Sequence, residues 1–171
     1  RRVQLAGRQA HLQAQGVASL AGCPYKGLAR FEATDADNFF GRERLVAELL
    51  ARVSETSLVA VVGPSGSGKS SLLRAGLLPA LAAGVLARAE PWRTVALCPG
   101  VRPTQELAAH LRDVPARGGP RAVLVDQFEE IFTMVEDSAL AKRFMDSIYA
   151  AVTDPRSTVR VVITLRADFL D

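Results

Sequence analysis

Residues 63–70, GPSGSGKS, match the pattern GxxxxGK[ST] of a phosphate-binding loop, known as Walker A, at every required position. Glycines at this spacing let backbone N–H groups turn inward around a β-phosphate, which a Cβ would block. Lys69 places a positive charge near the β- and γ-phosphates, and the Ser70 hydroxyl is the expected Mg²⁺ ligand. We therefore predict binding of a nucleoside triphosphate, ATP with Mg²⁺, and of ADP. The predicted contacts are Gly63, Pro64, Ser65, Gly66, Ser67, Gly68, Lys69, Ser70 and Ser71.

Three carboxylates follow a second apolar run. Residues 121–126, RAVLVD, read as a strand that ends in Asp126, which is expected to hold Mg²⁺ through a bound water. Glu129 and Glu130 are the only acids close enough in sequence to orient and deprotonate an attacking water. The sequence does not decide between these two. They also have a simpler interpretation, as first-turn acids that complement a helix dipole.

An arginine closes a third apolar run. Residues 161–166, VVITLR, read as a strand that ends in Arg166. The carboxyl ends of central parallel strands face the crevice where ligands bind, so Arg166 is a candidate contact to the γ-phosphate that senses its presence. The alternative is an arginine that is solvated at the end of its strand.

Alternating strands and helices are expected to position these residues, which predicts an α/β fold with a parallel sheet sandwiched by helices. The run at 58–62 has the apolar, β-branched character of a strand buried on both faces. The helix from Lys69 is expected to end near Leu78, with Pro79 opening a second turn. The expected strands are 58–62, 94–98, 121–126 and 158–165, and the other expected helices are 42–53, 104–112 and 138–152. A strand before the loop and a helix after it argue against a Gly/Ser-rich loop with a chance lysine.

The composition limits the class of protein. At 171 residues, 49% hydrophobic and 23% charged, the chain has the size and balance of one globular domain. The longest uncharged apolar stretch, 75–87, is too short to cross a bilayer, and no signal-peptide pattern is visible. We therefore expect no membrane partner and a cytoplasmic location. Cys23 and Cys98 lack metal-ligand spacing, so no zinc site and no disulfide are expected.

The net charge of +3 is unevenly distributed, because residues 1–31 contain basic side chains and no acid. A basic tail can contact nucleic acid, but a solvated linker is the favoured interpretation. We expect residues 1–22 to be a linker or the tail of a preceding domain, and residues 23–171 to form the nucleotide-binding domain. The start at Arg1 and the end at Asp171, directly after a strand, suggest a piece of a longer polypeptide.

Taken together, four stretches resemble the STAND class (signal transduction ATPases with numerous domains), specifically its bacterial novel-STAND branch. Transporter ATPases and guanylate kinases carry nearly the same loop. A transporter ATPase, however, should show an LSGGQ-like signature and an acid where Gln127 stands. The four stretches are CPYKGLARFEATDADNFFGRE at 23–43, GPSGSGKSSLLRAGLLPAL at 63–81, VLVDQFEEIFT at 123–133 and VVITLRADFLD at 161–171.

The resemblance implies a role for each candidate. Residues 39–43 match an element beside the adenine and ribose, which makes Phe40, Gly41 and Arg42 nucleotide contacts. It also implies that the strand of Arg166 lies between the strand of the phosphate loop and the strand of Asp126. The matched residues on the phosphate side are Asp126 for Walker B, Glu129 and Glu130 for the distal acidic pair, and Arg166 for the sensor.

The resemblance further implies a regulatory ATPase with slow hydrolysis, closed on ADP and assembled into a homo-oligomer when ATP-bound. It implies an attached effector domain and propeller-type repeats, with nucleic acid contacted only through an attached domain. The family's fifth strand, helical lid and winged-helix portion are not within residues 23–171, so we expect a truncated sheet of about four core strands. Two alternatives stay open: a nucleotide-binding scaffold without hydrolysis, and the gating domain of a DNA-binding transcription regulator.

Overall fold

The computed structural model describes residues 26–27, 29–86, 91–111 and 119–169. The chain divides into two compact units, Arg1–Arg30 and Phe31–Asp171. The expected linker at 1–22 lies outside the described residues, as does Cys23. The fold and the candidate site therefore concern the Phe31–Asp171 unit.

Four parallel strands form the centre of this unit: β1 (Leu58–Gly63), β2 (Arg93–Leu97), β3 (Arg121–Val125) and β4 (Val159–Arg166). Their order in the sheet is β1-β4-β3-β2. The predicted α/β parallel fold is confirmed, and so is the place of β4 between β1 and β3. Because all four strands run in one direction, the residues that follow β1, β3 and β4 meet at one edge of the sheet.

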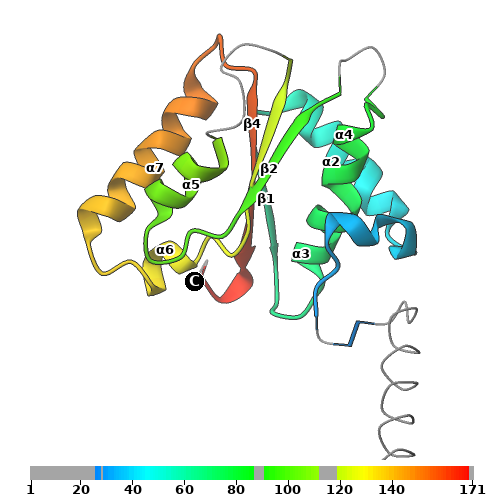
Figure 1. Ribbon diagram of the computed structural model, residues 1–171, viewed down its shortest axis with the longest axis horizontal. Helices are drawn as coiled ribbons and strands as arrows, with labels where there is room; N and C mark the ends of the chain where they lie inside the picture. Colours follow the sequence, from blue (N-terminus) through cyan, green and yellow to red (C-terminus); the bar gives the residue numbers. More distant parts are fainter. Residues whose placement is uncertain (1–25, 28, 87–90, 112–118, 170–171) are drawn as a thin grey trace, which may run out of the picture. The chain divides into compact units, whose positions relative to one another are not determined.

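Helices cover both faces of the sheet (Figure 1). One face packs against α2 (Glu43–Glu55) and against a continuous helix at 69–82. The other face packs against the three described helices that lie between residues 103 and 153. Strand side chains alternate between the two cores, so Leu124 and Val162 belong to the first, and Val123 and Val161 to the second. The remaining helical elements are η1 (Ala33–Asn38), α5 (Pro103–Leu111), α6 (Glu130–Thr133), α7 (Ser138–Thr153) and η3 (Ala167–Phe169). None of the described helices is long and apolar enough to span a bilayer.

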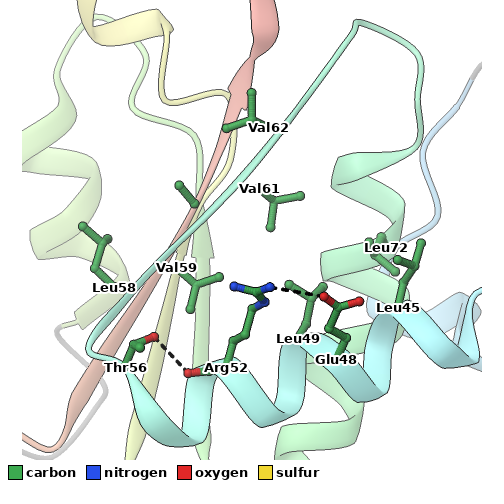
Figure 2. A pocket seen from close by; sticks show the side chains of 11 residues that line it. Leu45, Glu48, Leu49, Arg52, Thr56, Leu58, Val59, Val61, Val62 and Leu72 are labelled. Atoms are coloured by element: carbon green, nitrogen blue, oxygen red, sulfur yellow. Dashed lines mark hydrogen bonds and ion pairs between the residues drawn. The ribbon is translucent and has the colours of Figure 1, made fainter. Parts of the chain in front are cut away.

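The prediction that the first strand is buried on both faces was wrong. β1 lies at one end of the strand order, where Val59 and Val61 pack toward α2 and toward the helix at 69–82. Leu58 and Val62 are exposed. A groove of 380 Å³ runs between α2 and β1 (Figure 2). The sequence of a strand reports its apolar character, but not which of its faces a neighbouring element covers.

The expected end of the helix near Leu78 was also wrong. α3 (Lys69–Ser71), η2 (Leu72–Leu77) and α4 (Leu78–Ala82) follow one another without a break, and η2 is π-helical. The Leu78 N–H bonds to the carbonyl of Leu73, five residues back. Pro79, which has no N–H, falls where the helix returns to α-helical bonding, so it removes one bond without ending the helix.

Candidate nucleotide-binding site

The predicted phosphate loop connects β1 to the helix at 69–82. Gly66 and Gly68 have φ angles of 74° and 85°, in the left-handed region that favours glycine. A Cβ on Gly63 would lie 3.3 Å from the Ser67 Oγ, so the start of the loop also has little room for a side chain. The loop conformation therefore depends on the two glycines of the pattern, Gly63 and Gly68, and on Gly66 between them.

Lys69 holds its charge against the same loop. Its Nζ donates hydrogen bonds to the carbonyl oxygens of Gly63 at 2.7 Å and Pro64 at 2.8 Å. An ammonium group has three donors, and two of them are used within the loop. The ammonium group thus lies at the mouth of the loop, where its charge attracts an anion.

Asp126 links the loop to the two central strands. Its carboxylate is fully buried, and Oδ1 accepts hydrogen bonds from Ser70 Oγ and from Thr164 Oγ1, each at 2.8 Å. Its Oδ2 accepts from Arg74 Nε at 3.0 Å. The structure therefore brings the two predicted metal ligands together although they are 56 positions apart. Arg74 and Thr164 were not predicted, and their only sequence signal is a polar residue within an apolar run.

The donors at this point fit Mg²⁺. The described residues contain no group of three or more His, Cys, Asp or Glu side chains that could hold a metal. Magnesium does not require such a group, because it is usually bound by one or two protein oxygens together with phosphates and waters. The Ser70 hydroxyl and the Asp126 carboxylate, hydrogen-bonded at the mouth of the loop, supply two such oxygens.

Glu129 and Glu130 have different surroundings. Glu129 is 7% exposed, and its Oε2 is buried without a hydrogen-bond partner among the described residues. Glu130 begins α6, and its Oε2 accepts the backbone N–H of Gly100 at 3.0 Å, in the loop after β2. The turn from Asp126 into α6 passes through Gln127, which has a φ of 56°. One acid is therefore bound to a neighbouring loop, and the other has an unpaired buried oxygen.

Arg166 lies beside the phosphate loop, because it pairs with Gly63 in the register of β4 and β1. Its Nε donates to the Asp168 Oδ1 at 3.1 Å, and its guanidinium lies 5.7 Å from the ring centre of Phe169. The hydrogen bond to Asp168 raises the pKa of Arg166, as does the nearby charge of Glu129 to a smaller extent. The same bond lowers the pKa of Asp168, and Lys69 adds to that effect.

A cavity of 260 Å³ lies where the segment at 31–42 meets the end of the phosphate loop and the start of the following helix. Phe40 and Arg42 were predicted nucleotide contacts and line it, whereas Gly41 does not. Gly41, with a φ of 81°, donates its N–H to the Glu43 Oε1 at 2.8 Å. The pKa of Glu43 is lowered by its own backbone N–H and by this bond. The lining residues are Phe31, Asn38, Phe39, Phe40, Arg42, Gly68 and Ser71.

Comparison with known proteins agrees with this geometry. Over 50 residues the chain is 46% identical to the zinc import ATP-binding protein ZnuC of Cereibacter sphaeroides. Those residues are 28% of this chain and 21% of ZnuC, so the chain spans about a fifth of the length of that curated relative. Residues 24–171 match the family described as Novel STAND NTPase 1. The chain therefore belongs to the novel STAND NTPase family, and nucleotide binding follows from that membership.

Proposed function

We propose that this chain binds ATP and ADP with Mg²⁺ and acts as a nucleotide-dependent switch that hydrolyses ATP slowly. The observation that supports this most directly is the hydrogen bond from Ser70 to Asp126 at the mouth of the phosphate loop. A hydroxyl and a carboxylate held together there are the pair of oxygens that a nucleotide-bound Mg²⁺ uses in P-loop proteins. Family membership and the ATP-binding function in the name of the relative support the same proposal.

Binding is divided between the two sides of the loop. On the phosphate side, the N–H groups of residues 63–70 and the Lys69 ammonium group hold the phosphates. On the other side, the cavity lined by Phe40 and Arg42 receives the base and ribose, with aromatic rings to pack against. When bound, Mg²⁺ supplies charge neutralisation on the phosphate oxygens, with Ser70 and Asp126 as the residues that would hold it.

Glu129 is the proposed base for hydrolysis. A general base needs a carboxylate oxygen that is not already engaged and that can reach a water beside the γ-phosphate. The unpaired Oε2 of Glu129 meets the first condition, and the turn that leads into Glu129 is bonded to Thr164 of β4 through the N–H groups of Gln127 and Phe128. Glu130 is the weaker candidate, because it already accepts the N–H of Gly100.

Arg166 gives the site a way to distinguish ATP from ADP. Its guanidinium is bonded to Asp168 beside the loop. A γ-phosphate carries more negative charge than one carboxylate and so competes for the same guanidinium. A ligand shifts a conformational equilibrium only by its differential affinity for the two states. This contact therefore supplies the difference that a switch between a closed ADP form and an assembled ATP form requires.

The test is a calorimetric titration of ATP and ADP, each with Mg²⁺, into the parent chain and Lys69→Ala. Loss of a charge-assisted bond costs roughly 1.5–3 kcal/mol, so we expect the variant to bind at least about tenfold more weakly. Lys142→Ala, which removes an exposed lysine paired with Asp146 on α7, is the matched control and should bind like the parent. Circular dichroism checks that each variant is folded.

The result that contradicts nucleotide binding at this loop is an unchanged dissociation constant for Lys69→Ala. Phosphate release then separates the switch from the scaffold. Slow release by the parent that Glu129→Gln abolishes supports turnover. Tight binding with no release would favour the non-hydrolysing scaffold.

A further inference from the structure

Arg74 occupies a position that the proposed function does not explain. It lies in η2 among buried leucines, and its side chain is only 11% exposed. A buried guanidinium group loses much of its hydration, so it is tolerated only where partners compensate for that loss. Arg74 has three partners: Asp126 Oδ2 at 3.0 Å, Glu32 Oε2 at 3.2 Å and Cys98 Sγ at 3.7 Å. These partners come from three separate parts of the chain.

We propose that Arg74 is a positioning residue that fixes the orientation of the Asp126 carboxylate for the metal, and that Glu32 in turn holds Arg74. This inference rests on the proposed function, since it concerns the same magnesium-dependent site. It assigns a role in that site to two residues outside the phosphate loop and outside the predicted contacts.

The directions of the bonds carry the first half of the proposal. A guanidinium group is planar, so its N–H donors point in fixed directions, unlike those of an ammonium group. Arg74 Nε engages Oδ2 of Asp126, while Oδ1 accepts from Ser70 and Thr164. With donors on both oxygens, the carboxylate cannot rotate freely. The oxygen that faces Ser70 is therefore the one that stays beside the phosphate loop.

The segment at 31–38 carries the second half. It is attached to the helix after the loop at two points: the Phe31 N–H donates to Ser71 Oγ at 3.0 Å, and Glu32 accepts from Arg74. The Glu32 N–H also donates to Asp35 Oδ2 at 2.7 Å, in the capping arrangement at the start of η1. The backbone of Glu32 is thus held at the start of η1, in a position from which its carboxylate reaches Arg74.

The test measures how much Mg²⁺ strengthens ADP binding. Dissociation constants of ADP are determined with Mg²⁺ and with a chelator for the parent, Arg74→Gln, Glu32→Gln and the double variant. For Arg74→Gln we expect the gain from Mg²⁺ to fall roughly tenfold, while binding without Mg²⁺ stays close to that of the parent. Glu32→Gln should reduce the gain in the same direction but by less. The double variant should match Arg74→Gln, because Glu32 acts through Arg74.

Two further variants sharpen the result. Arg74→Lys keeps the charge but not the planar donors, so it should not restore the gain. Arg52→Gln removes the exposed ion pair with Glu48 on α2, drawn in Figure 2, and should leave the gain unchanged. If Arg74→Gln does not fold, Glu32→Gln still decides, because the Glu32 side chain is 40% exposed and its removal leaves Arg74 paired with Asp126.

Equal losses of affinity with and without Mg²⁺ would overturn the proposal, because they would mean that Arg74 only supports the fold. So would full recovery by Arg74→Lys, or multiplicative losses in the double variant. A parent chain that binds no ADP, or binds it without regard to Mg²⁺, would instead overturn the proposed function, and this inference with it.

Discussion

Arg166 and Gly63 are register partners, and each is the last residue of its strand. Arg166, at the end of β4, therefore lies beside Gly63, the first residue of the phosphate loop. Asp168 engages the guanidinium at that place through Nε and a second nitrogen. Arg166 is thus near the loop and already paired with Asp168. Replacing Arg166 and replacing Asp168 should therefore change the affinity for ATP in opposite directions.

Removing the arginine should weaken ATP selectively. Arg166→Ala loses a charge-assisted contact worth roughly 1.5–3 kcal/mol, so ATP should bind about tenfold or more weakly, with ADP almost unaffected. Titration calorimetry with both nucleotides measures the difference. Arg156→Ala, which removes an exposed arginine paired with Asp154, is the control. Equal losses for ATP and ADP would rule out a sensor role, as would no loss for either.

Removing the competing carboxylate should act in the opposite direction. Asp168→Asn releases Arg166 and removes the negative charge of a carboxylate whose pKa is lowered by Arg166 and, to a smaller extent, by Lys69. Exposed ion pairs are weak, so we expect ATP affinity to rise by only about two- to fivefold, with a smaller rise for ADP. The same titrations measure it. A decrease in ATP affinity would indicate that Asp168 orients Arg166 instead of competing for it.

The same pair gives a prediction on pH. The hydrogen bond from Arg166 lowers the pKa of Asp168 below its ordinary value of 3.8. A lowered folded-state pKa means that the contribution to stability is fully present above 3.8 and is lost as the pH falls through the folded-state pKa. Urea unfolding should therefore show Asp168→Asn to be less stable than the parent at pH 7, with the difference vanishing in strong acid. A difference that grows in acid would contradict this assignment.

The sequence predicts the frame of the site well, because its signals are local. The glycines of the loop, the apolar run before Asp126 and the run before Arg166 each indicate one structure within a few residues. Parallel strands then bring their ends together without further information.

Contacts between distant residues could not be predicted in this way. Arg74 and Asp126 are 52 positions apart, and no periodicity marks a single arginine within an apolar helix as the partner of one particular carboxylate. The different surroundings of Glu129 and Glu130 depend on Gly100, in a loop of another strand. The exposed face of β1 depends on which elements pack beside it, which its own residues do not encode.

A glycine within η2 gives a prediction on packing. A Cβ at Gly76 would lie 2.6 Å from Val46 Cγ2 and 3.2 Å from Phe39 Cε1. Overpacking of this kind typically costs about 1–3 kcal/mol, which exceeds the gain of up to about 1 kcal/mol from replacing glycine by alanine in a helix. Gly76→Ala should therefore lower the free energy of unfolding in urea, and Val46→Ala should restore part of it. A stabilised Gly76→Ala variant would show that the helix moves away at little cost.

The last prediction separates the two adjacent acids. Glu129→Gln replaces the proposed base by an amide that cannot take a proton, so turnover should fall by roughly 10²–10⁴. Binding of ATP should change little, because Glu129 is not among the proposed binding groups. Glu130→Gln is the matched variant one position later. Its amide oxygen can still accept the N–H of Gly100, so turnover should stay near that of the parent.

Single-turnover phosphate release, with the protein in excess over ATP and at saturating concentration, measures the chemical step in both variants without interference from binding. The comparison holds the substitution constant and changes only the position, so a general effect of lost charge would appear in both variants. A slow Glu130→Gln with an active Glu129→Gln would reverse the assignment. Equal slowing would favour a role for the pair in setting the local field, because a proton acceptor has to be one atom of one residue.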